Sequence, residues 1–278
     1  MIAASKPPAA IIEELGITEP SDIDIEAIAE YCGATIVYES LEGSEARILG
    51  AGDRAIITVN SSSPRPRQRF SAGHELGHWM RDRGKVAFAC EERSFIREWG
   101  DDNAERRANR YAADLLLPRK VFQPRLVELA PTFDCVRQLA REFETSLTAT
   151  AIRLVELGRK PAIVIASERS GRKWFFRADV VPETLWPCER PGSDTLAAKL
   201  LDGSIKPATA APIDLPADEW IDHPDASRFT VREDSMLAYN GTVLTLLSWP
   251  DDSQLTALHG PDEELVNELT GELRFPRR

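Results

Sequence analysis

Residues 71–80 read SAGHELGHWM and contain two of the four histidines of this 278-residue chain. His74 and His78 are four residues apart, and because four residues turn an α-helix by about 400°, both imidazoles leave the same helix face one turn apart. Two such histidines can bind one tetrahedral metal ion, and Glu75 is placed to accept a proton from a water molecule at the open position. The stretch therefore predicts the ligand helix of a hydrolytic zinc site, with Glu75 as general base. The alternative is an ordinary helix that carries two partly buried histidines.

A catalytic zinc site needs a third protein ligand, and the other histidines, His223 and His259, lie far along the sequence. We therefore expect a carboxylate on another element, and Glu105 is the leading candidate because it opens the helical stretch ERRANRYAADLLL. Small residues that would let this helix approach the histidine helix share its face: Ala108, Asn109 and Ala112. Other candidate carboxylates lie in less regular sequence: Glu91, Glu92, Glu98, Asp101 and Asp102.

Three residues of the same helical stretch are candidates for supporting roles in the site: Asn109, Tyr111 and Asp114. Asp114 would hydrogen-bond a ligand histidine and so orient its ring. Tyr111 would stabilise an oxyanion, and a tyrosine of the core or the surface is the alternative. Two imidazoles and one carboxylate suit Zn²⁺, with Mn²⁺ as the alternative ion.

The first 160 residues have the pattern of helices around a small sheet. Apolar spacing predicts helices over 7–17, 22–33, 67–82, 103–117, 119–130 and 134–157, the last one broken near TSLTAT. Strands are expected over 34–41 and 54–63, joined by a glycine-rich turn. The charged segment 83–103 is interpreted as a loop or lid. The Gly and Pro of LGRKP mark a domain boundary near residue 160.

Beyond this boundary the pattern changes to strands with one helix. Strands are expected over 162–167, 173–180, 228–233, 242–249 and 272–275, and a helix over 194–203. The Pro- and Ala-rich stretch 205–220 is interpreted as an exposed loop. The chain is thus predicted to be an α+β protein with two domains, 1–160 and 161–278, the second with a regulatory, sensor or partner-binding task.

Charge and cysteine content restrict the function classes. Lys and Arg number 34 against 45 Asp and Glu, so the formal charge of −11 repels a phosphate backbone and direct DNA binding is not expected. The four cysteines lie far apart, which is typical of reduced thiols in a cytoplasm. Since no leader and no apolar run of roughly 20 residues is evident, we expect a cytoplasmic protein without a membrane partner.

Residues 134–158 resemble a helix-turn-helix in their pattern, with apolar positions on two helices and a turn near Thr145 and Ser146. A DNA-binding regulator is therefore a second function class. Against it, the second helix has Arg153 as its one basic residue before Arg159, which is poor provision for phosphate contacts. The alternative is a helical pair that completes the core of the first domain.

The stretch RQRFSAGHELGHWM at 67–80, followed by ERRANRYAADLLLP at 105–118, resembles the ImmA/IrrE family of bacterial zinc metallopeptidases. The resemblance covers about residues 20–160 and implies a compact zincin-like core. In this core His74, His78 and Glu105 hold zinc and Glu75 activates water. Some long family members append a GAF-like sensor, and the expected C-terminal domain is compatible with one.

Members of this family typically cut a helix-turn-helix repressor of the Xre type at one peptide bond. The cut releases genes of stress responses, mobile elements or toxin–antitoxin pairs. The resemblance therefore implies a site-specific endopeptidase with a repressor as its protein substrate. The alternative is a non-proteolytic regulator whose metal is structural and which binds a protein partner or DNA through its helix-turn-helix-like segment.

Overall fold

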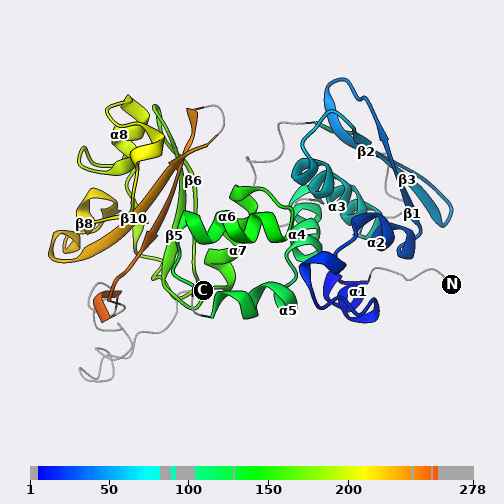
Figure 1. Ribbon diagram of the computed structural model, residues 1–278, viewed down its shortest axis with the longest axis horizontal. Coiled ribbons are helices and arrows are strands. Elements are labelled where there is room, and N and C mark those ends of the chain that lie inside the picture. Colours follow the sequence, from blue (N-terminus) through cyan, green and yellow to red (C-terminus); the bar gives the residue numbers. More distant parts are fainter. Residues whose placement is uncertain are drawn as a thin grey trace, which may run out of the picture. The chain divides into compact units, whose positions relative to one another are not determined.

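The structure is a computed structural model that describes residues 6–81, 89–91, 104–127, 129–238, 241–251 and 253–255. The chain divides into two compact units, each with its own helices and sheet (Figure 1). The first comprises Met1–Leu129 and Asp134–Arg153, and the second Ala130–Phe133 and Leu154–Arg278. The α+β fold class is confirmed. Within the described ranges, no helix has the length and hydropathy that a membrane span requires.

The first unit contains a four-stranded sheet with the order β1-β3-β2-β4. Its strands are β1 (Ala34–Glu39), β2 (Ser44–Ala51), β3 (Arg54–Asn60) and β4 (Ala89–Glu91). β1 runs parallel to β3, whereas β2 is antiparallel to both β3 and β4. Ala55, Ile57 and Val59 of β3 are buried and alternate with exposed Arg54 and Ile56 over the first half of the strand. One face of the sheet therefore carries the core, against which α3 (Arg65–Arg81) packs.

The remaining helices of the first unit match the expected ones in place and order. They are α1 (Pro8–Glu14), α2 (Ile25–Tyr31), α4 (Ala104–Leu116), α5 (Arg119–Phe122), α6 (Phe133–Glu142) and α7 (Leu147–Leu157), of which Phe133 and Leu154–Leu157 are assigned to the second unit. The predicted break near TSLTAT is the turn between α6 and α7. Asp24 starts α2 because its side chain accepts hydrogen bonds from two backbone N–H groups of the first turn. Short 3-10 helices lie at Pro20–Asp22 and Gln123–Leu126.

Strand β2 corrects the expectation of a glycine-rich turn between two strands. Gly43 and Gly52 adopt positive φ angles of 74° and 61°, so the glycines turn the chain at the two ends of a strand. Between them Ala46 and Ile48 are buried in alternation with exposed residues. Gly50 lies against an indole ring, since a Cβ there would be 2.6 Å from Cζ3 of Trp79. Because glycines are typical of turns, the sequence pattern did not indicate this strand.

The second unit contains an antiparallel five-stranded sheet with the order β6-β5-β11-β10-β8. Its strands are β5 (Ala162–Glu168), β6 (Gly171–Arg177), β8 (Ile213–Pro216), β10 (Thr230–Leu237) and β11 (Val243–Ser248). Two short strands, β7 (Trp186–Pro187) and β9 (Ile221–Asp222), form a separate antiparallel sheet. The expected helix is α8 (Leu196–Asp202). Short 3-10 helices lie at Pro207–Thr209, Ala217–Glu219 and Ala226–Arg228.

Part of the stretch 205–220 is a strand, so the expectation of an exposed loop is wrong there. β8 pairs with β10, and its Leu215 is buried opposite Val231. Its Pro216 is tolerated because β8 is an edge strand. The strand expected over 272–275 lies outside the described residues, as does the loop or lid over 83–103 except for β4. A GAF-like character of this unit remains a prediction.

Candidate metal centre

The helices α3 and α4 approach each other closely because small residues meet at their interface. A Cβ on Gly73 would lie 3.2 Å from Cβ of Ala112, and a Cβ on Gly77 would lie 2.9 Å from Cα of Ala108. Figure 1 shows the two helices side by side, and they make extensive contact. The small residues of α4 form one half of this interface. The glycines of SAGHELGHWM are the matching half of the interface.

Three side chains from these two helices bring their donor atoms together. Nε2 of His74 lies 3.3 Å from Oε2 of Glu105, and Nε2 of His78 lies 3.3 Å from Oε1 of the same carboxylate. The two Nε2 atoms are 3.1 Å apart, with the imidazole rings nearly perpendicular at 81°. One ligand atom from each residue lies within 4.8 Å of the others, so the group could hold a metal ion.

The chemistry of this donor set fits a zinc-type ion. Nδ1 of His74 lies 2.8 Å from Oδ1 of Asn109, and because an amide oxygen accepts, Nδ1 carries the hydrogen. Nε2 of His74 is then left with a lone pair that faces the other donor atoms. Two imidazole nitrogens and a carboxylate this close repel one another unless a cation lies among them. Two histidines and one carboxylate are also a common protein ligand set of catalytic zinc sites.

The electrostatics of the group keep the carboxylate ionised. The neighbouring imidazoles of His74 and His78 hold the pKa of Glu105 far below its usual range, and their effect outweighs the opposing effect of burial. Glu75, between the two histidines in sequence, is 1% exposed. The group thus combines an ionised carboxylate with two buried imidazoles, and Glu75 is buried on the same helix as the two histidines.

Tyr111 and Asp114 have other partners than those expected from the sequence. The buried hydroxyl of Tyr111 donates to the carbonyl oxygen of Lys6 at 2.9 Å, and burial raises its pKa. Asp114 accepts from Nη2 of Arg153 at 2.7 Å and from Nε of Arg110 at 3.2 Å. The orienting contact to a ligand histidine comes from Asn109 instead.

The helical angle explains this difference. Asn109 follows Glu105 by four residues and lies on the same face of α4, whereas Asp114 follows it by nine residues, about 900° of helical rotation, and lies on the opposite face. The angle could have been read from the sequence. The alternative third ligands Glu92, Glu98, Asp101 and Asp102, and the side chain of Glu91, lie outside the described part of the structure.

Comparisons with known proteins agree with this geometry. Residues 29–155 match the family model of the IrrE N-terminal-like domain, Peptidase_M78. A transcriptional regulator of Mycobacterium tuberculosis has a similar structure, with a TM-score of 0.56 and 15% identity over 87% of this chain and 74% of that chain. At this identity the similarity concerns the fold alone, and no curated protein matches the chain. Residues 29–155, which include α3 and α4, are therefore similar to the IrrE N-terminal-like domains of the Peptidase_M78 family.

Proposed function

We propose that the chain is a zinc-dependent, site-specific endopeptidase. The observation that carries the proposal is the convergence of His74, His78 and Glu105 from two helices that both lie inside the peptidase family match. Glu75 adds a buried carboxylate next to the first histidine. A purely structural metal site has no use for a base at this position.

In this proposal His74, His78 and Glu105 hold the zinc ion, which would polarise the scissile carbonyl as a Lewis acid. Asn109 keeps the hydrogen of His74 on Nδ1 and thereby directs Nε2 toward the site. The carboxylate of Glu75 takes one proton from the attacking water molecule. Glu75 then passes this proton to the nitrogen of the leaving amine as the peptide bond breaks.

The proposed substrate is a helix-turn-helix repressor of the Xre type. The family resemblance of the two motifs implies this class of substrate, and the regulator from M. tuberculosis with a similar fold makes a role in transcription plausible. The formal charge of −11 would favour association with a basic, DNA-binding protein. Such a role also places the enzyme in the cytoplasm, where its repressor and the DNA are found.

Cleavage of candidate repressors tests this proposal, beginning with any Xre-type protein encoded beside this gene. Wild-type protein and Glu75→Gln are compared, and the zinc content of both samples is measured. We expect both proteins to hold zinc and only the wild type to cut at one bond. If both samples hold zinc and the wild type cuts no repressor, this result would contradict the proposal that the chain is an endopeptidase.

A non-proteolytic, metal-binding regulator is the second candidate, because the similar solved structure is a transcriptional regulator that matches over most of this chain. In that case Glu75→Gln would bind the repressor as tightly as the wild type, and neither would cut it. The residues of α7 argue against sequence-specific DNA binding by this helix. Its one basic residue, Arg153, is 3% exposed and pairs with Asp114.

A further inference from the structure

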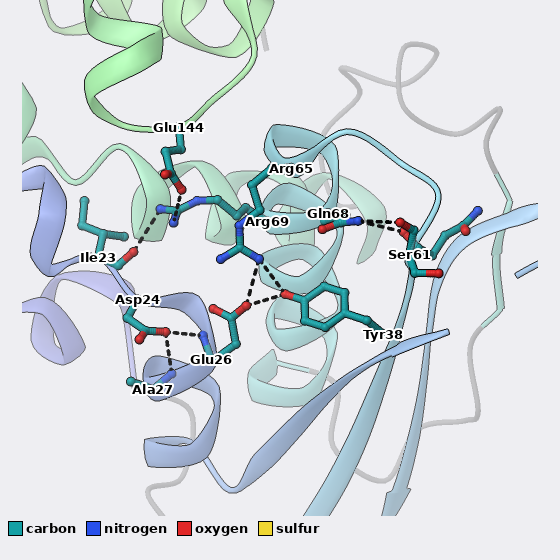
Figure 2. Close-up of polar contacts among 11 residues, drawn as sticks. Ile23, Asp24, Glu26, Ala27, Tyr38, Ser61, Arg65, Gln68, Arg69 and Glu144 are labelled. Atoms are coloured by element: carbon teal, nitrogen blue, oxygen red, sulfur yellow. Dashed lines mark hydrogen bonds and ion pairs between the residues drawn. The ribbon is translucent and has the colours of Figure 1, made fainter. Parts of the chain in front are cut away.

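Arg69 ties the histidine helix to the turn between α6 and α7. It lies on α3 five residues before His74 and is 5% exposed. Its Nη1 is 3.1 Å from Oε2 of Glu144, and its Nη2 donates to the carbonyl oxygen of Ile23 at 3.0 Å (Figure 2). A buried guanidinium needs partners, and the pair with Glu144, whose side chain is 55% exposed, joins α3 to the α6–α7 turn.

Glu144 makes this contact from a backbone position that favours glycine. Its φ angle is 50°, the single positive value outside glycine among the described residues. The N–H of Thr145 donates to the carbonyl of Ala140 and the N–H of Glu144 to that of Arg141, which is the hydrogen-bond pattern of a Schellman motif. Glycine is the usual residue at this position, so the turn alone does not explain a glutamate. The ion pair of its carboxylate with Arg69 accounts for a glutamate at this position.

Arg153 ties α7 to the end of the second ligand helix. Its Nε donates to the carbonyl oxygen of Leu117 at 2.8 Å, one residue beyond the end of α4, and its Nη2 is 2.7 Å from Oδ1 of Asp114. A cation at the carboxyl end of a helix also interacts favourably with the helix dipole. Arg153 thus fixes α7 to the helix that carries Glu105.

Both contacts lie at the same end of the α3–α4 pair. Gly73 meets Ala112 and Gly77 meets Ala108, so the helices run antiparallel and the first turns of α3 lie level with the last turns of α4. Arg69 belongs to the former, and Asp114 to the latter. The α6–α7 pair therefore closes one end of the two ligand helices, through one buried arginine on each side.

We propose that the α6–α7 pair is a brace that sets the spacing of the metal ligands, with Arg69 and Arg153 as positioning residues. The inference rests on the proposed zinc site. It assigns the helix-turn-helix-like segment to the peptidase core, where Arg153 contacts α4 and the α6–α7 turn contacts α3. The donor atoms lie about 3 Å from one another, so small shifts of α4 against α3 would separate them.

The dissociation constant of zinc, measured by chelator competition, tests the brace. The variants are Glu144→Gly and Arg153→Lys, with Arg141→Met at an exposed site on α6 as the control. Glu144→Gly is the informative change, because glycine suits the positive φ and so offsets part of the stability that is lost with the partner of Arg69. We expect both variants to bind zinc about tenfold more weakly or worse, and the control to match the wild type.

Each outcome has a distinct meaning. Weaker zinc binding by Glu144→Gly, measured well below the melting temperature of the metal-free variant, supports the brace, since a contribution to folding alone would not weaken zinc binding by the folded protein. Wild-type affinity in Glu144→Gly and Arg153→Lys would overturn the brace and leave the proposed function intact. Wild-type protein that binds no zinc would overturn the proposed function, and the brace with it.

Discussion

Asn109 Oδ1 lies 2.8 Å from Nδ1 of His74, one helical turn after Glu105 on α4. One turn of α4 therefore supplies both a ligand candidate and the group that orients another ligand. Loss of such an orienting hydrogen bond commonly weakens metal binding about 10- to 100-fold. We predict this loss for Asn109→Ala, and zinc affinity equal to or above that of the wild type for Asn109→Asp, which keeps an acceptor oxygen. Zinc titration checks both, with the exposed Lys120→Ala as the control. Equal affinity in Asn109→Ala and the wild type would contradict the assignment.

Gly77 sets the distance between the two ligand helices. A Cβ there would lie 2.9 Å from Cα and 3.1 Å from the carbonyl oxygen of Ala108, both of them backbone atoms that cannot rotate away. We predict that Gly77→Ala lowers the free energy of unfolding by about 1–3 kcal/mol and weakens zinc binding. Denaturant unfolding and zinc titration give the two quantities.

Gly73→Ala supplies an internal comparison, because its new Cβ would meet the Cβ of Ala112 at 3.2 Å. We expect Gly73→Ala to weaken zinc binding as well. The double variant Gly73→Ala/Ala112→Gly removes the methyl group of Ala112 and should recover part of that zinc affinity. The pair Gly77→Ala/Ala108→Gly should recover little, because the obstacle there is backbone. Equal recovery in both pairs would contradict this packing account.

Much of this site could be predicted from the sequence because it is local. The spacing of His74 and His78 and the small residues of α4 depend on helical geometry alone. The glycines of β2 resemble a turn and so conceal the strand in the sequence, and Asp114 lies on the face of α4 opposite to Glu105. The Arg69–Glu144 pair joins residues 75 positions apart, so no local pattern indicates it.

Glu26 makes the stability of the first unit sensitive to acid. Arg65 Nη1 donates to its carboxylate at 3.0 Å, and the hydroxyl of Tyr38 donates to the same oxygen (Figure 2). Burial disfavours the ionised form, but these hydrogen bonds outweigh it and lower the pKa of Glu26 from 4.5 to about 2. A depressed pKa stabilises the fold above the unfolded value of 4.5, and this contribution is lost as the pH falls toward 2.

We therefore predict that Glu26→Gln melts at a lower temperature than the wild type at pH 7. The difference should shrink as the pH is lowered from 4.5 toward 2. Melting curves across this range check the prediction, with Glu42→Gln at an exposed site as the control for the loss of one charge. A difference that stays constant with pH would show that the carboxylate does not act through its charge.

The zinc content of the purified protein tests the central claim most directly. Wild-type protein, Glu105→Ala and Glu75→Gln are loaded with zinc, dialysed against a weak chelator and analysed by mass spectrometry of the metal. The account predicts about one zinc ion per chain for the wild type and for Glu75→Gln, and far less for Glu105→Ala. Equal zinc in the wild type and in Glu105→Ala would contradict a centre built from His74, His78 and Glu105.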